Sequence, residues 1–194
     1  PFASPSHISI QVSRARAAFP AFCFVSPVTR IALQDFLTRK FEEQVSDFSF
    51  RAKGSGKSGL ISTTCCVQEI LERTACQITD SEIILRFTVG FPANGRTINS
   101  YELEKIFFDF LPVCVQKSVF YRNLSSKAVE ETIFLAEDQQ YIRMELKKRN
   151  LCAFVADGAI LPRQSGVSQK PMKNSVPFSS PDSLKVELML PHKG

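Results

Sequence analysis

The alternation of hydrophobic and polar residues predicts strands near both ends of the chain. Ile8, Ile10 and Val12 alternate with polar neighbours, a period of two that is typical of a strand with one buried face. Alternating or short apolar runs flanked by turn residues predict strands over residues 7–13, 75–79, 82–89, 151–156 and 183–190. The second and third of these are predicted to form a hairpin across Asp80-Ser81. The last needs a neighbouring strand with which to pair.

Helical spacing dominates the middle of the chain. A helix of about residues 30–46 is predicted from one stripe of apolar residues, Leu33, Phe36, Leu37, Phe41 and Val45. Asn99, with Glu102 three residues later, is typical of a helix N-terminus. Pro112 lacks a backbone N–H, so we expect the helix to break or kink there before the helical pattern resumes over residues 113–124.

A third helix is predicted to begin after a cap at Ser125 or Ser126 and to stop at Asn150. A long loop rich in Pro, Ser, Gln and Lys follows over residues 161–181. These elements predict an α+β fold, in which a mostly antiparallel sheet with hairpins is covered on one face by a central block of about three to four helices.

A cluster of glycine and basic residues resembles a phosphate-binding loop but does not match its motif. The motif G-x-x-x-x-G-K-[ST] needs a glycine five residues before Gly56, where this chain has Arg51. A P-loop also opens a helix, whereas β-branched residues follow Gly59. Three interpretations stay open: the tip of a hairpin, a contact to a polyanion, or a mononucleotide cradle. The residues that would contact nucleotide or nucleic-acid phosphates are Arg51, Lys53, Gly54, Ser55, Gly56, Lys57 and Ser58.

Composition and charge limit the kinds of site and partner that this chain can have. The chain has 194 residues, 44% of them hydrophobic, and a net charge of +5, so it can bury one or two cores and is mildly basic. Its six cysteines show no C-x-x-C spacing and its two histidines lie near the ends, so we predict no metal site and no catalytic residue. The cysteines suit buried positions in a reducing, intracellular compartment, either cytoplasm or organelle matrix. No apolar run approaches the roughly 18 residues of a membrane span, so no membrane partner is expected.

A second polar cluster follows the strand predicted over residues 151–156. Asp157, Gly158 and Arg163 lie where that strand would end, and Phe178 follows a proline in the long loop. Two interpretations remain for the first three: a turn with a solvated arginine, or a contact to nucleotide or to a neighbouring domain. Phe178 would anchor a core or domain interface, or stack on a base.

Several sequence strings also resemble a known family, the predicted ATPases of the ABC class, in the region upstream of their Walker A motif. The strings follow the family's order over nearly the whole chain, and they include PFASPS at 1–6, VTRIALQDFL at 28–37, QEILERT at 68–74, FTVGFPA at 87–93 and FVADGAILPR at 154–163.

The resemblance implies a division of labour within a longer protein. We expect residues 1–194 to form the N-terminal accessory domain of such an ATPase, with a last strand at about 183–190 leading into a P-loop domain outside this sequence. The Walker A lysine and the metal-binding acidic residue would lie in that domain. ATP and Mg would therefore be cofactors of the parent protein, and this chain would bind neither fully.

Three functions follow as hypotheses. The first is a non-catalytic module that packs against the ATPase domain of the same chain and contacts nucleotide or nucleic-acid phosphates. The second is a stand-alone module that binds RNA or DNA through the basic glycine-rich hairpin. The third is an atypical P-loop enzyme that binds nucleotide through the same loop.

Overall fold

The computed structural model describes residues 4–47, 58–64, 66–95 and 97–192. They fall into two compact units, Pro1–Cys66 with Ile70–Ile133, and Val67–Glu69 with Phe134–Gly194. The first unit holds the sheet and most of the helices, and the second holds the irregular C-terminal segment.

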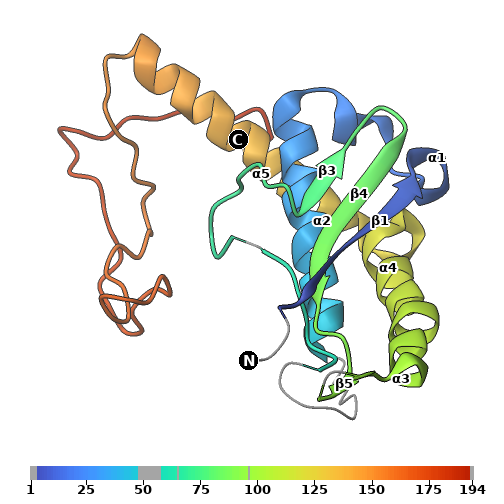
Figure 1. Cartoon of the computed structure of the whole chain (residues 1–194). Helices are drawn as coiled ribbons and strands as arrows, with labels where there is room; N and C mark the ends of the chain where they lie inside the picture. The colour runs from blue at the N-terminus through green and yellow to red at the C-terminus, as the bar shows by residue number, and fades with distance from the viewer. Residues whose placement is uncertain (1–3, 48–57, 65, 96, 193–194) are drawn as a thin grey trace. The chain divides into compact units, whose positions relative to one another are not determined.

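The first unit is built on an antiparallel sheet with β4 at its centre (Figure 1). Its strands are β1 (Ser6–Ser13), β2 (Ile61–Ser62), β3 (Cys76–Ile78) and β4 (Glu82–Val89). The strand β1 pairs with β4 along its whole length, and β2 and β3 share the opposite edge of β4. Two further short strands, β5 (Ala93–Asn94) and β6 (Thr97–Ile98), pair with each other.

The predicted hairpin and first strand are confirmed. Ile8 lies opposite Phe87, and Val12 lies opposite Ile83. The turn between β3 and β4 is closed by the backbone N–H of Thr79, which donates to the carbonyl of Glu82 at 2.9 Å. Every second residue of β4 is buried, because that face of the sheet lies against helices.

The described helices lie between and after these strands in the chain. In chain order they are α1 (Arg14–Ala17), the 3₁₀ helix η1 (Ala21–Phe24), α2 (Pro27–Asp47), α3 (Ser100–Glu104), the π-helix η2 (Lys105–Phe110), α4 (Leu111–Val119), the 3₁₀ helix η3 (Tyr121–Asn123) and α5 (Ser126–Lys148). No described helix is long and apolar enough to cross a membrane.

The core forms where α2 lies against the buried face of the sheet (Figure 1). Leu33, Leu37 and Phe41 of α2 are at most 1% exposed. The ring of Phe41 packs on Phe87 of β4 with 5.0 Å between centroids. The predicted stripe of this helix is therefore its core face, and the predicted α+β fold is confirmed.

Pro112 is accommodated without ending the helical run. The π turn η2 precedes it, and the proline takes one of the first two positions of α4, where its missing N–H needs no partner within the helix. The predicted break is thus a change of helical type upstream of the proline. The prediction that the helix runs on to Leu124 is wrong, because α4 ends at Val119 and Phe120 is extended.

Two predicted strands are absent from the described chain. Residues 151–156 and 183–190 have no ladder partner, and the structure shows them as irregular backbone within the second unit. An alternating pattern specifies which side chains share a face, but a strand also needs the backbone N–H and C=O groups of a neighbour. Among the described residues, no neighbouring strand pairs its backbone N–H and C=O groups with either segment.

Candidate functional site

The glycine-rich cluster lies largely outside the described residues, and only its end is seen. Ser58 is described, and its hydroxyl accepts a bond from the backbone N–H of Ala93 at 3.4 Å. Gly59 follows at φ 74°, a left-handed conformation that suits glycine. Its N–H donates to the carbonyl of Gly90 at 2.7 Å, and Gly90 donates to Leu60 at 2.8 Å.

These bonds lead the chain directly into β2 and onto the edge of β4. A phosphate-binding loop leads instead into the N-terminus of a helix, where backbone N–H groups are free to hold an anion. The phosphate-contact role of the seven candidate residues between Arg51 and Ser58 stays a prediction.

The second cluster is drawn together by backbone bonds within the second unit. Gly158, at φ 84°, donates its N–H to the carbonyl of Phe178 at 2.8 Å, and Phe178 donates back to Ala159 at 2.9 Å. The carboxylate of Asp157 accepts two bonds from Ser180, from the N–H at 2.6 Å and from the hydroxyl at 2.7 Å. Arg163 lies apart from this pair of segments and donates to the carbonyl of Ile160 at 2.7 Å.

The bonds from Ser180 hold the pKa of Asp157 below its usual range, first through the hydroxyl and then through the backbone N–H. Both donors come from Ser180, so the carboxylate of Asp157 links the backbone before the long loop to residue 180 near the end of that loop. This arrangement is that of a turn, and the contact to nucleotide or to a neighbouring domain remains a prediction for these four residues.

A hollow on the exposed face of the sheet, lined by hydroxyl and basic side chains as well as apolar ones, was not predicted from the sequence. It has a volume of about 570 Å³ and lies where β2 and the segment before β3 approach the same edge of β4. Six of the described residues that line it carry hydroxyl groups and three carry basic side chains: Ser9, Ser62, Thr63, Thr64, Thr74 and Thr88, with His7, Arg73 and Arg86.

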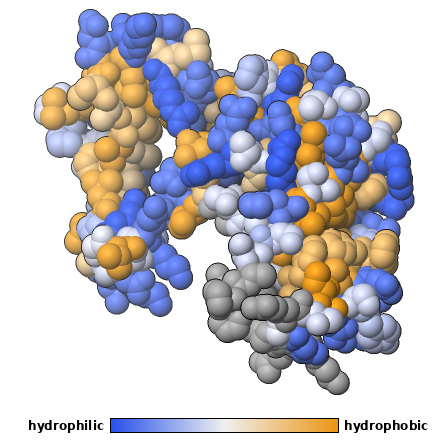
Figure 2. All heavy atoms as spheres, viewed as in Figure 1, coloured by the Kyte–Doolittle hydropathy of each residue, from blue (hydrophilic) through white to orange (hydrophobic). Residues whose placement is uncertain are grey.

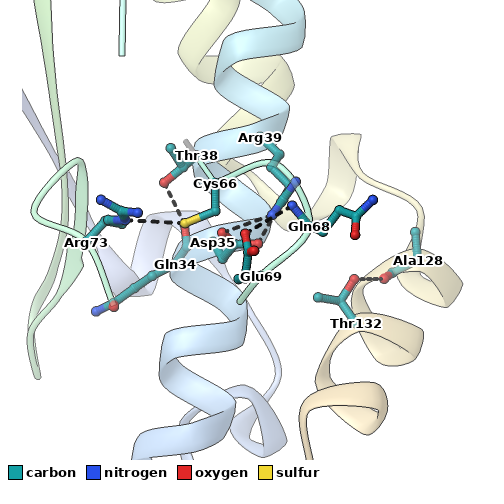
Figure 3. A network of polar contacts seen from close by, with 10 residues as sticks. All are labelled: Gln34, Asp35, Thr38, Arg39, Cys66, Gln68, Glu69, Arg73, Ala128 and Thr132. Carbon is teal, nitrogen blue, oxygen red and sulfur yellow. Dashed lines mark hydrogen bonds and ion pairs between the residues drawn. The ribbon is translucent and has the colours of Figure 1, made fainter. Parts of the chain in front are cut away.

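Two arginines of this hollow are held in different ways. Arg86 donates to the carbonyl of Thr74 and to the side-chain oxygen of Gln77, both at 2.9 Å, so its guanidinium is fixed above the sheet. Arg73 donates from Nε to the Sγ of Cys66 at 3.3 Å. In Figure 3 the terminal nitrogens of Arg73 point away from that sulfur.

The sequence held part of the signal for this hollow. The polar residues of the two long strands alternate with their buried ones, and the register places Ser9 opposite Arg86 and His7 opposite Thr88. The alternation of polar and apolar residues is visible in the sequence. The register of the strands and the position of Arg73 beside them follow only from the folded structure. Reading each strand alone concealed the cluster, because its members come from four separate segments.

A separate polar group on α2 has a structural role in the first unit. Asp35 is nearly buried and receives Arg39, one turn later, at 2.7 Å, as seen in Figure 3. Thr38 returns its hydroxyl to the carbonyl of Gln34 at 2.8 Å. These bonds satisfy the carboxylate of Asp35 and the hydroxyl of Thr38 on α2.

Together these features define an α+β module that carries polar surfaces but no P-loop motif in its sequence. The chain belongs to the ATPases of the ABC class. The N-terminal family of these ATPases matches residues 1–122, and their P-loop domain matches residues 125–194. No curated protein matches the chain.

P-loop domains in general bind a nucleoside triphosphate with Mg²⁺. They do so through a Walker A lysine, which reaches the terminal phosphates, and a hydroxyl that binds the metal. The 194 residues contain no G-x-x-x-x-G-K-[ST] sequence, so the matched part of the P-loop domain does not include that motif. The 194 residues therefore lack the motif's lysine and hydroxyl that would hold the triphosphate and Mg²⁺.

Proposed function

We propose that residues 1–194 form a non-catalytic N-terminal module of an ABC-class ATPase, which packs against the nucleotide-binding domain of the same protein. ATP and Mg²⁺ would be bound by residues outside this sequence. The module would contribute an interface and polar surfaces, and its own side chains would perform no chemistry.

The observation that carries this proposal is the exposed apolar surface of the second unit. Apolar side chains in its irregular segment project into solvent, and Figure 2 shows orange residues running along this segment. The most exposed are Val167, Val176, Leu184 and Met189, at 99%, 87%, 75% and 79%. Isolated exposed apolar residues are ordinary, but a long segment of them with few regular backbone bonds favours an interface.

The segment from residue 183 to residue 190 strengthens the argument. Its alternating pattern is that of a strand, and it lies within the match to the P-loop domain. A strand edge supplied by the rest of that domain would satisfy its backbone groups and cover one row of its side chains. The packing proposal thus accounts for both the pattern and its missing partner.

Contact with nucleotide or with RNA or DNA is the second part of the proposal. Its support is the group of basic residues Arg51, Lys53 and Lys57, which suits a phosphate backbone and would give salt-sensitive binding. Three such contacts alone would give weak affinity, so this role would accompany the packing role.

The packing proposal is tested by one double substitution in two contexts. Leu184→Asp with Val186→Asp places charge on side chains that are 75% and 40% exposed in this chain. We expect the unfolding temperature of the 194-residue chain to stay unchanged, because both side chains already face solvent. In a chain extended through the nucleotide-binding domain, the same change should lower the unfolding temperature by several degrees, since it would bury unpaired charge.

The matched control is Lys185→Asp, which places the same side chain on the opposite face of the predicted strand. We expect it to leave both proteins unchanged. Equal unfolding temperatures for the double variant and the unsubstituted extended protein would contradict the proposed packing.

A further inference from the structure

The hollow on the exposed face of the sheet has the charge of an anion site. Of the described residues that line it, none is acidic, whereas Arg73, Arg86 and His7 are basic. The hydroxyl groups come from both sides of β4, with Ser9 on β1 and Ser62 on β2. Guanidinium and hydroxyl groups are the side chains that most often contact phosphate oxygens.

The guanidinium of Arg86 bonds to the short backbone segment that carries Arg73. Arg86 donates to the carbonyl of Thr74, and Thr74 follows Arg73 directly in the chain. This bond fixes the backbone that carries Arg73 beside the side chain of Arg86. A guanidinium fixed in advance loses less entropy when it binds an anion.

The hollow matches a small ligand in size and charge. Its volume of about 570 Å³ lies within the range of small-molecule sites, roughly 300–1,000 Å³. A phosphomonoester carries a charge of about −1.5 to −2 at neutral pH, which two arginines can balance.

The lining also lacks what a polynucleotide would need. Proteins that bind single strands stack successive bases on aromatic rings. Of the described rings in this lining, Phe87 is only 4% exposed and packs on Phe41 beneath the sheet, which leaves the single imidazole of His7 on the exposed face. The exposed face therefore offers phosphate contacts without a row of rings for successive bases.

We propose that this hollow binds the terminal phosphate of a phosphomonoester of mononucleotide size, with Arg73 and Arg86 on the phosphate and the hydroxyls of Ser9 and Ser62 at its edges. The residues that line the hollow belong to the first unit, whereas residues 184–190 belong to the second. The site is therefore independent of the packing proposed above, and each proposal can fail alone.

The test is a titration of the isotopically labelled 194-residue chain with adenosine 5′-monophosphate, followed by amide NMR. We expect shifts that saturate and that are confined to the hollow, including the amides of Ser9, Ser62 and Thr88. Adenosine without its phosphate should give none. Arg73→Gln should weaken binding by about tenfold or more, because a charge-assisted bond is lost.

The control is Arg143→Gln, an exposed arginine of α5 outside the hollow, which removes the same charge and should leave the affinity unchanged. Ser9→Asp is a second variant, on an exposed strand position, that should abolish binding by repelling the phosphate. Unchanged unfolding temperatures would show that both variants fold.

Four outcomes would overturn the inference. These are no shift within the hollow, equal shifts from adenosine, equal weakening by Arg73→Gln and Arg143→Gln, or binding of a uridine decamer where the monophosphate does not bind. The last would assign the surface to a polynucleotide.

Discussion

Burial determines the chemistry of individual cysteines in this chain. Desolvation raises the pKa of the Cys76 thiol to about 12, and of the Cys23 and Cys114 thiols to about 11. The thiolate is the reactive form, so these three thiols are inert in the folded protein. Their burial agrees with the structural role predicted from the sequence, whereas Cys152 is exposed and departs from it.

This contrast predicts an order of alkylation. With iodoacetamide at about pH 8, the peptide that contains Cys152 should be modified in the native chain, whereas those with Cys23, Cys76 and Cys114 should react only after denaturation. Mass spectrometry of digested samples over time measures the order. Early modification of Cys76 would show that the sheet opens on the timescale of labelling, contrary to the core described above.

The polar residues show why a site can escape prediction at this scale. Asp157 and Gly158 were singled out because they are neighbours in sequence, and the structure gives them a turn with bonds to Ser180 and Phe178. Arg73 and Arg86 are thirteen residues apart and become neighbours only through a bond to Thr74. Local patterns reveal turns, whereas a binding surface assembled from several strands depends on their register.

At the scale of single elements, helix caps were the most predictable features. The side chain of Asn99 accepts the backbone N–H of Glu102 at 3.3 Å, and Ser125 accepts that of Ala128 at the same distance. Asn150 takes the left-handed conformation, φ 55°, that stops α5. These signals depend on a few neighbouring residues, so the sequence carries them in full.

The Asn99 cap can be tested by substitution. Asn99→Ala should lower the free energy of unfolding by about 1 kcal/mol, because an N–H at the start of α3 loses its acceptor. The measurement is urea denaturation followed by circular dichroism. Glu104→Ala, an exposed position of the same helix, is the control and should change stability little. Equal effects of the two substitutions would show that the cap contributes nothing specific.

Strands were harder to predict than helices, for a physical reason. The pattern of β4 is strong, and β3 pairs with it as the predicted hairpin implies. The strand β1 also pairs with β4, although no partner was predicted for it. Residues 183–190 have an equally clear pattern, yet they form no strand among the described residues. Side-chain alternation is encoded locally, but pairing depends on a partner that can lie far away in the chain.

At the scale of the whole molecule, the two units differ in how they are stabilised. The first has a core in which α2 covers the sheet, with Leu33 and Ile83 fully buried. The second consists mainly of irregular backbone and exposed side chains after α5 ends at Lys148. A segment with so little apolar burial gains little free energy from folding alone, and covering it at an interface would supply the missing burial.

We propose that the nucleotide site of the ATPase to which this chain belongs lies outside residues 1–194. A ligand well above its dissociation constant stabilises the folded state, by about 2.7 kcal/mol at a hundredfold excess. The most direct measurement is the unfolding temperature with and without millimolar ATP and Mg²⁺, for this chain and for a chain extended through the nucleotide-binding domain. We predict a rise for the extended chain and, when both chains carry Arg73→Gln to remove binding at the hollow, none for residues 1–194. A rise in the shorter chain that disappears with Lys57→Ala would contradict the claim, because it would place the triphosphate in the glycine-rich loop.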